Sequence, residues 1–172
     1  MKLLLKDKTK ANIFMTIFRQ LKSHVDVVNI NFEENRLYMQ GMDSGQVSLF
    51  ELQLQKNWFD EYEATGEVLG LNCGVLHAVF NGMEADHELQ LYTEEDGDVL
   101  FMNLTSDENG VFDKLYEISL IDLEQHMLSV PNTYWELDLQ LKSQSFAKII
   151  DQLTQFGDDI KLSCTEEKIE LS

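Results

Sequence analysis

Apolar residues recur at helical spacing in three segments of the chain, and alternating patterns fill most of the sequence between them. Helices are predicted at about residues 11–23, 73–81 and 145–156, because side chains three and four residues apart fall on one face of a helix. Asn72 can cap the second helix and Gly82 can end it. The pattern therefore predicts three amphipathic helices among strands.

The first predicted helix carries no acidic residue on its outer face. Its apolar face consists of Ile13, Phe14, Ile17, Phe18 and Leu21, and its outer face of Asn12, Met15, Thr16, Arg19, Lys22 and Ser23. Because the chain as a whole is acidic, this absence is informative. A helix face that is merely solvated would show the same pattern.

The alternating segments predict β-strands joined by tight turns. One hairpin is indicated where two such segments flank residues 33–35, and another where they flank residues 93–98. The strands are predicted at residues 27–32, 36–40, 46–53, 88–92, 99–104 and 135–141.

The order of these elements repeats along the chain. Seven apolar positions of the first helix and hairpin have apolar counterparts 132 residues later. They are Phe14, Ile17, Leu21, Ile30, Phe32, Leu37 and Met39, matched by Phe146, Ile149, Leu153, Leu162, Cys164, Ile169 and Leu171. Residues 68–104 repeat the strand–helix–hairpin order more loosely. Repeated strand–helix–strand–strand units predict an α+β fold in which antiparallel sheets carry helices on one face.

Residues 121–133 are predicted to connect two domains. The segment holds the only proline, Pro131, and lies where the repeat restarts. The first domain is then residues 1–120, and residues 134–172 form the first part of a second, incomplete domain. The connector's apolar residues, Leu128 and Val130, suit a docking surface and suit equally a loop packed into its own core.

Acidic residues outnumber basic ones by 31 to 13, which gives the 172-residue chain a formal charge of −18. That charge argues against a simple basic protein that binds nucleic acid or membrane surfaces. Residues 1–22, however, carry six basic residues and one acid. Because charges are screened beyond about 8 Å at physiological salt, this basic pole can still hold phosphates at short range.

Catalytic and metal-binding patterns are lacking. No phosphate-binding glycine loop, nucleophile elbow or zinc-protease motif occurs, and the four histidines are widely spaced. Cys73 and Cys164 lie far apart in sequence, which fits a reducing compartment and excludes a disulfide scaffold. No apolar run reaches the length of a membrane span or a secretory signal. We therefore expect a non-enzymatic, intracellular protein without metal or cofactor.

Residues 40–49, which read Gln-Gly-Met-Asp-Ser-Gly-Gln-Val-Ser-Leu, resemble a characteristic strand of sliding clamps of the proliferating cell nuclear antigen (PCNA) family. The agreement continues at residues 59–62, 70–72, 122–123, 128–131 and 145–149. The resemblance implies a homotrimeric ring that encircles duplex DNA at sites of replication, in a nucleus or, for a virus or archaeon, in cytoplasm. It also implies a clamp loader and a role in tethering DNA polymerase and other replication and repair proteins.

The resemblance places helices around the hole of the ring and sheets on its outside. Candidate residues for loose phosphate contacts are then Lys10, Arg19, Lys22, Lys142 and Lys148. Weak contacts without base readout suit a clamp, which must slide. Ala78, Asn81 and Asp151 stand where basic residues are usual in the family, so the first helix is expected to supply most of the DNA contact.

Partner proteins of the family insert a short motif with aromatic anchors beside the connector. By position, the pocket that receives the motif is formed here by Met42, Gln46, Val47, Leu49, Leu128, Val130 and Pro131. Gln46 stands where animal members carry histidine, and its amide still donates and accepts hydrogen bonds. Without the resemblance, Met42, Val47 and Leu49 would be interpreted as ordinary strand core.

Two alternatives to a ring-forming clamp stay open. The chain ends at Ser172, partway through the family's second domain, so we expect this length of chain not to close a ring by the family's route. One alternative is a monomeric or dimeric polymerase processivity subunit that sits on DNA. The other is an acidic adaptor that binds proteins and makes no DNA contact.

Overall fold

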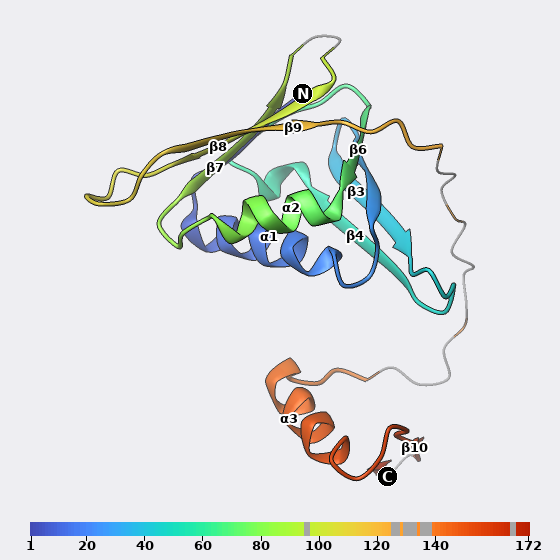
Figure 1. Ribbon diagram of the computed structural model, residues 1–172. Coiled ribbons are helices and arrows are strands. Elements are labelled where there is room, and N and C mark those ends of the chain that lie inside the picture. The colour runs from blue at the N-terminus through green and yellow to red at the C-terminus, as the bar shows by residue number, and fades with distance from the viewer. Residues whose placement is uncertain (95–96, 125–127, 129–133, 135–138, 166–167) are drawn as a thin grey trace. The chain divides into compact units, whose positions relative to one another are not determined.

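The computed structural model describes residues 1–94, 97–124, 128, 134, 139–165 and 168–172 (Figure 1). These residues fold as two units, Met1–Ser129 and Val130–Ser172. The boundary between the units falls inside the connector predicted at residues 121–133. No helix in the described ranges is long and apolar enough to span a lipid bilayer.

Two antiparallel sheets make up most of unit 1, with strand orders β5-β1-β7-β8-β9 in the first sheet and β4-β3-β2-β6 in the second (Figure 1). The first sheet comprises β1 (Lys2–Leu5), β5 (Glu61–Glu63), β7 (Glu88–Thr93), β8 (Val99–Thr105) and β9 (Lys114–Ser119). The second comprises β2 (Val27–Phe32), β3 (Arg36–Met42), β4 (Leu49–Gln55) and β6 (Glu67–Asn72). The predicted α+β fold with antiparallel sheets is therefore confirmed.

Helix α1 (Lys8–Leu21) begins earlier than its apolar spacing predicts. The carboxylate of Asp7 accepts hydrogen bonds from the backbone N–H groups of Thr9 at 2.8 Å and Lys10 at 3.2 Å. Such a cap satisfies donors that the helix itself cannot pair, so the helix starts directly after Asp7. The 3-10 helix η1 (Lys56–Trp58) lies later in the chain, between β4 and β5.

The buried face of α1 differs from the prediction. Met15, expected on the outer face, is buried, whereas Ile13, expected in the core, is 48% exposed. The reason is α2 (Cys73–Asn81), which packs beside α1 (Figure 1). Contact with a second helix turns the buried stripe toward the side that carries Met15, a shift that the periodicity of α1 alone does not encode.

A single apolar cluster forms the core of unit 1, enclosed by the two sheets and the two helices. Buried and less buried residues alternate along β1, β2, β7 and β8, as in sheets that place one face on a core. The largest fully buried side chains include four phenylalanines, Phe14, Phe18, Phe32 and Phe80. Both helices therefore bury one face in this cluster.

Unit 2 repeats the helix and hairpin of unit 1. It contains α3 (Ser143–Leu153), β10 (Leu162–Cys164) and β11 (Ile169–Leu171). Leu162 lies opposite Leu171 in the same register in which Ile30, 132 residues earlier, lies opposite Met39. The repeat predicted between these segments is therefore confirmed by backbone pairing.

Two predicted strands differ from the observed ones. Strand β4 begins at Leu49 and not at residue 46, because hydrogen bonds to Asp43 close residues 43–48 into a loop. Of the strand predicted at residues 135–141, residues 135–138 lie outside the described residues, and residues 139–141 form no strand.

Candidate functional site

Helices α1 and α2 carry no carboxylate side chains of their own, and we call their exposed side the carboxylate-free side. Neither α1 nor α2 contains an aspartate or glutamate, although the chain has 31 of them. The basic residues of α1 and its C-cap are Lys8, Lys10, Arg19 and Lys22. Lys8 is paired with Asp86 at 3.3 Å and Glu108 at 3.5 Å, and these contacts raise its pKa. The other three are the residues predicted on this helix to face DNA.

Lys10 is held at the start of α1 by η1. Its Nζ donates a hydrogen bond to the carbonyl oxygen of Trp58 at 2.8 Å and lies 5.9 Å from the centroid of the Trp58 ring. One of the three ammonium donors is therefore occupied, and the charge is positioned by a cation–π contact.

Arg19 is fixed between the two helices of unit 1. Its Nη2 donates to the carbonyl oxygen of Phe80 at 3.0 Å and contacts the sulfur of Met15 at 2.9 Å. Its Nε is buried and has no hydrogen-bond partner within the described part of the chain. The guanidinium is thus held in one place by α2 and cannot swing freely.

A hollow of about 320 Å³ adjoins Arg19. It is lined by Arg19, Gln20, Lys22, Ser23 and His77, none of them acidic. His77 Nδ1 is 3.0 Å from the Arg19 carbonyl oxygen, which only accepts, so Nδ1 carries the hydrogen. His77 Nε2 then accepts from the Asn81 amide at 2.9 Å. The lining contains two basic residues and no acidic one, which suits an anion such as a phosphate.

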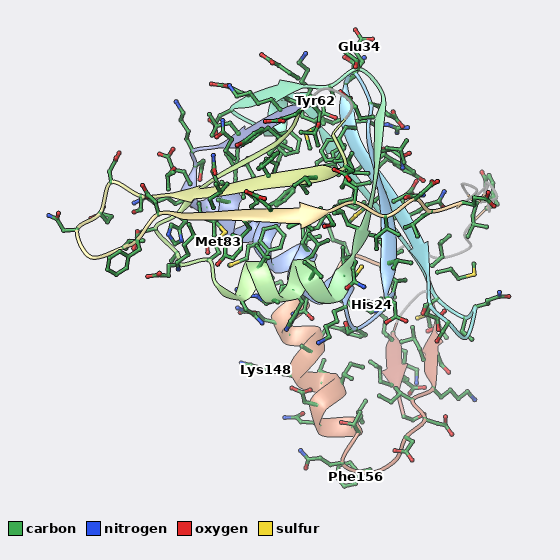
Figure 2. The ribbon with its side chains drawn as sticks, turned by 45° about the horizontal axis from the view of Figure 1, so that its top comes forward. His24, Glu34, Tyr62, Met83, Lys148 and Phe156 are labelled. Carbon is green, nitrogen blue, oxygen red and sulfur yellow. The ribbon has the colours of Figure 1, made fainter. Side chains whose placement is uncertain are left out.

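The structure brings together only part of the predicted DNA-facing set. Arg19 and Lys22 share the hollow, and Lys10 lies at the opposite end of α1. Lys142 and Lys148 belong to unit 2, where Lys142 precedes α3 and Lys148 projects from it, both exposed (Figure 2). The DNA role of all five stays a prediction.

The loop of residues 43–48 holds the predicted partner-binding residues of the second sheet. Met42 at the end of β3 lies opposite Leu49 at the start of β4. The Asp43 carboxylate accepts hydrogen bonds from the N–H groups of Val47 at 2.8 Å and Ser48 at 2.7 Å. These bonds, with that of Ser48 the largest, lower the pKa of Asp43. They fix the loop so that the Val47 side chain is 89% exposed.

Gln46 lies at the turn of the same loop. Its backbone φ is +54°, a conformation that few residues other than glycine adopt, and its N–H donates to the Asp43 carbonyl oxygen at 2.9 Å. Its side chain is exposed. The structure therefore brings Met42, Gln46, Val47 and Leu49 together, but as a loop and its flanks and not as strand core.

A second hollow, of about 560 Å³, adjoins Met42. The segment after α1 (residues 22–27) forms one wall, and Leu123 and Glu124 of the connector form another. Ser44 completes the lining, and His24, labelled in Figure 2, is part of the first wall. The hollow thus joins the loop at residues 43–48 to the start of the connector.

The connector part of the predicted pocket is only partly described. Leu128 is 43% exposed. Val130 and Pro131 lie outside the described residues. Membership of these three residues in one pocket with Met42 stays a prediction.

Two residues of these surfaces were not singled out by sequence reasoning. Asp43 orders the loop, and His77 bridges the helices. The signal for Asp43 is an aspartate at a chain reversal, where its side chain commonly binds backbone N–H groups a few residues on. His77 gives no comparable signal, because its partner is the Arg19 carbonyl, 58 positions away.

Within the described ranges, no three His, Cys, Asp or Glu side chains are grouped so as to hold a metal ion. Cys73 is fully buried, and burial raises the pKa of its thiol to about 11. Cys164, in unit 2, is partly exposed.

Two comparisons match most of the chain to known proteins. Residues 4–127 match the family model described as "Proliferating cell nuclear antigen, N-terminal domain". The chain is similar to proliferating cell nuclear antigen 2 of Plasmodium falciparum (isolate 3D7), with 24% identity over 168 residues. The alignment covers 94% of this chain and 64% of that protein, so the chain spans less than two thirds of this relative.

Proposed function

Since the chain belongs to the proliferating cell nuclear antigen family, we propose that it serves in a DNA sliding clamp. In this role it contacts duplex DNA without reading its sequence and tethers DNA polymerase and other replication or repair proteins. The role is non-enzymatic. The observation that carries the proposal is the carboxylate-free side of α1 and α2, where Arg19 and Lys22 share one hollow on an otherwise acidic protein.

The small number of available cations on this side suits sliding. Each phosphate contact to duplex DNA contributes about 0.9 to the slope of log affinity against log salt concentration. Lys8 is already paired with acids and Lys10 with a carbonyl oxygen, so few full contacts are available from α1. A surface of this kind holds a polyanion weakly at many equivalent positions, which a moving clamp requires.

The second sheet supports a role in holding partner proteins. Val47, within the loop that Asp43 fixes in place, is 89% exposed, and Leu49, directly after the loop, is 38% exposed. Exposed apolar side chains on an ordered backbone give a partner an anchor at low entropic cost. We include Leu128, Val130 and Pro131 of the connector in this docking site on the basis of the family resemblance.

For full-length family subunits, assembly as a homotrimeric ring opened by a clamp loader belongs to the same proposal. Strand β9 ends the first sheet, and its outer edge has no strand partner among the described residues. Leu115 on that strand is 58% exposed. A free strand edge with an apolar side chain supports pairing with a second copy.

The experiment for the DNA surface is binding of fluorescent duplex DNA, followed by anisotropy over a series of salt concentrations. For the wild-type chain we expect binding that weakens with salt and does not depend on sequence. Lys22→Glu should weaken it several-fold and lower the salt slope by about one, as for one lost phosphate contact. The matched control is Lys56→Glu, the same charge change on an exposed lysine of η1.

Three outcomes decide between the functions. Equal losses for Lys22→Glu and Lys56→Glu would place the DNA contact elsewhere and overturn the proposed surface. Absence of DNA binding by the wild-type chain would favour the acidic adaptor. Binding that a full-length subunit retains no longer on circular DNA than on linear DNA would favour a processivity subunit that does not form a ring.

A further inference from the structure

The connector begins as a bridge between the two sheets of unit 1. After β9, the N–H of Leu120 donates to the carbonyl oxygen of Asp98, beside β8, at 2.8 Å. The next N–H, of Ile121, donates to the carbonyl oxygen of Gly70 on β6 at 2.9 Å. Ile121 and Gly70 form an isolated antiparallel bridge. The connector therefore leaves the first sheet and adds to the free edge of the second.

Gly70 allows this approach because it has no side chain. A Cβ atom at residue 70 would lie 2.0 Å from the carbonyl oxygen of Ile121 and 3.1 Å from Oδ1 of Asn29. The first distance is far inside van der Waals contact, and the obstacle is backbone, which cannot rotate away. Any other residue at position 70 would push the connector off the sheet edge.

Asn29 supplies a second attachment two residues further along the connector. It lies opposite Gly70 in the pairing of β2 with β6. Its Nδ2 donates to the carbonyl oxygen of Leu123 at 3.1 Å. Leu123 and Glu124 then line the hollow of about 560 Å³ beside Met42.

We propose that Asn29 and Gly70 are positioning residues for the partner-binding site: together they hold residues 121–123 on the second sheet, so that the connector forms one wall of the hollow beside Met42. The inference rests on the proposed function, because it assigns these residues to the same docking site. Neither residue is part of the pocket that the family resemblance implies. Their effect on a partner passes through the position of the connector.

The test compares two substitutions of the same kind on one strand. In Asn29→Asp the carboxylate loses the N–H donor and faces the Leu123 carbonyl oxygen. In the control, Asn31→Asp, the lost bond is that of Nδ2 to the Tyr38 carbonyl oxygen at 3.3 Å, which lies within the sheet. Gly70→Ala is the third variant, and the unfolding midpoint of each variant shows whether it folds as the wild type does.

The probe is a fluorescein-labelled peptide with a pair of adjacent aromatic residues. The control peptide has the same sequence with both aromatic residues replaced by alanine. Asn29→Asp and Gly70→Ala should bind the aromatic peptide about tenfold more weakly than the wild type, and Asn31→Asp should bind it equally well. Hydrogen exchange should rise at Ile121, whose N–H is bonded to Gly70, in the first two variants and stay unchanged in Asn31→Asp. A purely structural role would lower the unfolding midpoint without this local exchange.

The outcomes separate the inference from the function on which it rests. If the wild-type chain binds the aromatic peptide, and Asn29→Asp binds it as well as Asn31→Asp does, the positioning role is wrong and the docking function stands. If the wild-type chain binds neither peptide, the docking function is wrong and the inference falls with it. Weaker binding with faster exchange confined to residues 121–124 supports both.

Discussion

The two copies of the repeated helix and hairpin share a backbone and differ in burial. Strands β2 and β3 pair in the register that β10 and β11 repeat 132 residues later. Phe14 on α1 is 1% exposed, whereas its counterpart Phe146 on α3 is 38% exposed. No residue of α3 is buried, whereas α1 buries five. Among the described residues, the same apolar spacing therefore accompanies a core helix in unit 1 and a helix without buried residues in unit 2.

The comparison shows that secondary structure and burial have different determinants. Turn chemistry and the spacing of apolar residues fix the helix and the hairpin register in both units. Burial requires a second layer, which in unit 1 is the first sheet together with α2. The described residues of unit 2 contain only a two-stranded sheet and one helix, too few elements to enclose a core.

The largest expected effect comes from removing the matched phenylalanines. Phe14→Ala should lower the free energy of unfolding of unit 1 by about 3–5 kcal/mol, because it leaves a cavity in the core. Phe146→Ala should cost less than about 1 kcal/mol, because its ring is already partly solvated. Urea unfolding followed by Trp58 fluorescence measures the loss in unit 1, since the Trp58 ring centroid is 6.3 Å from that of Phe14. Hydrogen exchange of the α3 amides over the same urea series measures the loss in unit 2. Equal losses would contradict the difference in burial between the units.

The next largest expected effect is a difference in thiol reactivity between the two cysteines. Cys73 is fully buried, and burial raises its pKa to about 11, so little reactive thiolate forms at pH 8. Cys164 is partly exposed. In labelling with a chromogenic disulfide reagent at pH 8, we expect Cys164 to react at least about a hundredfold faster than Cys73. Cys164→Ser should abolish the fast phase, and a fast phase that persists in that variant would assign it to Cys73.

A smaller effect is expected at the turn that joins β2 to β3. In both repeats an N–H to carbonyl bond closes the turn, from Glu33 to Arg36 and from Thr165 to Lys168, each at 2.9 Å. In the first turn the Tyr62 hydroxyl adds contacts, 2.8 Å from the Glu33 carbonyl oxygen and 2.6 Å from that of Arg36, beside the ion pair of Arg36 with Glu33. Tyr62→Phe should therefore cost about 1 kcal/mol of unfolding free energy. A loss within error of zero would assign the order of this turn to its backbone bond and the Glu33–Arg36 ion pair.

The smallest effect concerns the exposed loop after β3, where hydrogen bonds and not burial fix the backbone. The pKa of Asp43 lies below its ordinary value of 3.8, because the N–H groups of Ser48 and Val47 bind the charged form. The order that this carboxylate supplies is complete above that ordinary value and is lost as pH falls through the lowered pKa. The amide resonances of Val47 and Ser48 should therefore hold their positions down to about pH 4 and shift below it.

In Asp43→Asn the same two resonances should be shifted at every pH. Resonances of buried core amides, such as that of Leu37, serve as the internal control in the same spectra. A shift of the Val47 and Ser48 resonances already between pH 6 and 5, where only about a few percent of an unperturbed aspartate is protonated, would contradict the assigned cause.

Particular residues show which features the sequence could predict. The bounds of α2 follow from its cap at Asn72 and from Gly82, and the hairpin registers follow from alternating patterns. The burial of Met15 does not follow, because it depends on contact with a helix about 60 positions away. The short strands β1 and β5 escaped prediction because three or four residues carry little periodic signal.

The candidate sites show the same contrast between features that local sequence predicts and features that depend on packing. Met42, Gln46, Val47 and Leu49 are neighbours in sequence, so a local resemblance was enough to group them. The bridge between Gly70 and Ile121 and the bond between His77 and the Arg19 carbonyl join residues about 50 to 60 positions apart. Such pairs arise from packing, and nothing in their local sequence marks them.

The central claim is that the carboxylate-free side of α1 and α2 is the surface that contacts DNA. Hydrogen exchange of the chain with and without duplex DNA tests it most directly. Peptides from the end of α1 and from α2, which contain Lys22 and His77, should exchange more slowly with DNA bound, and residues 43–49 should not change. Slower exchange at residues 43–49, or none at the two helices when DNA is bound, would contradict the account.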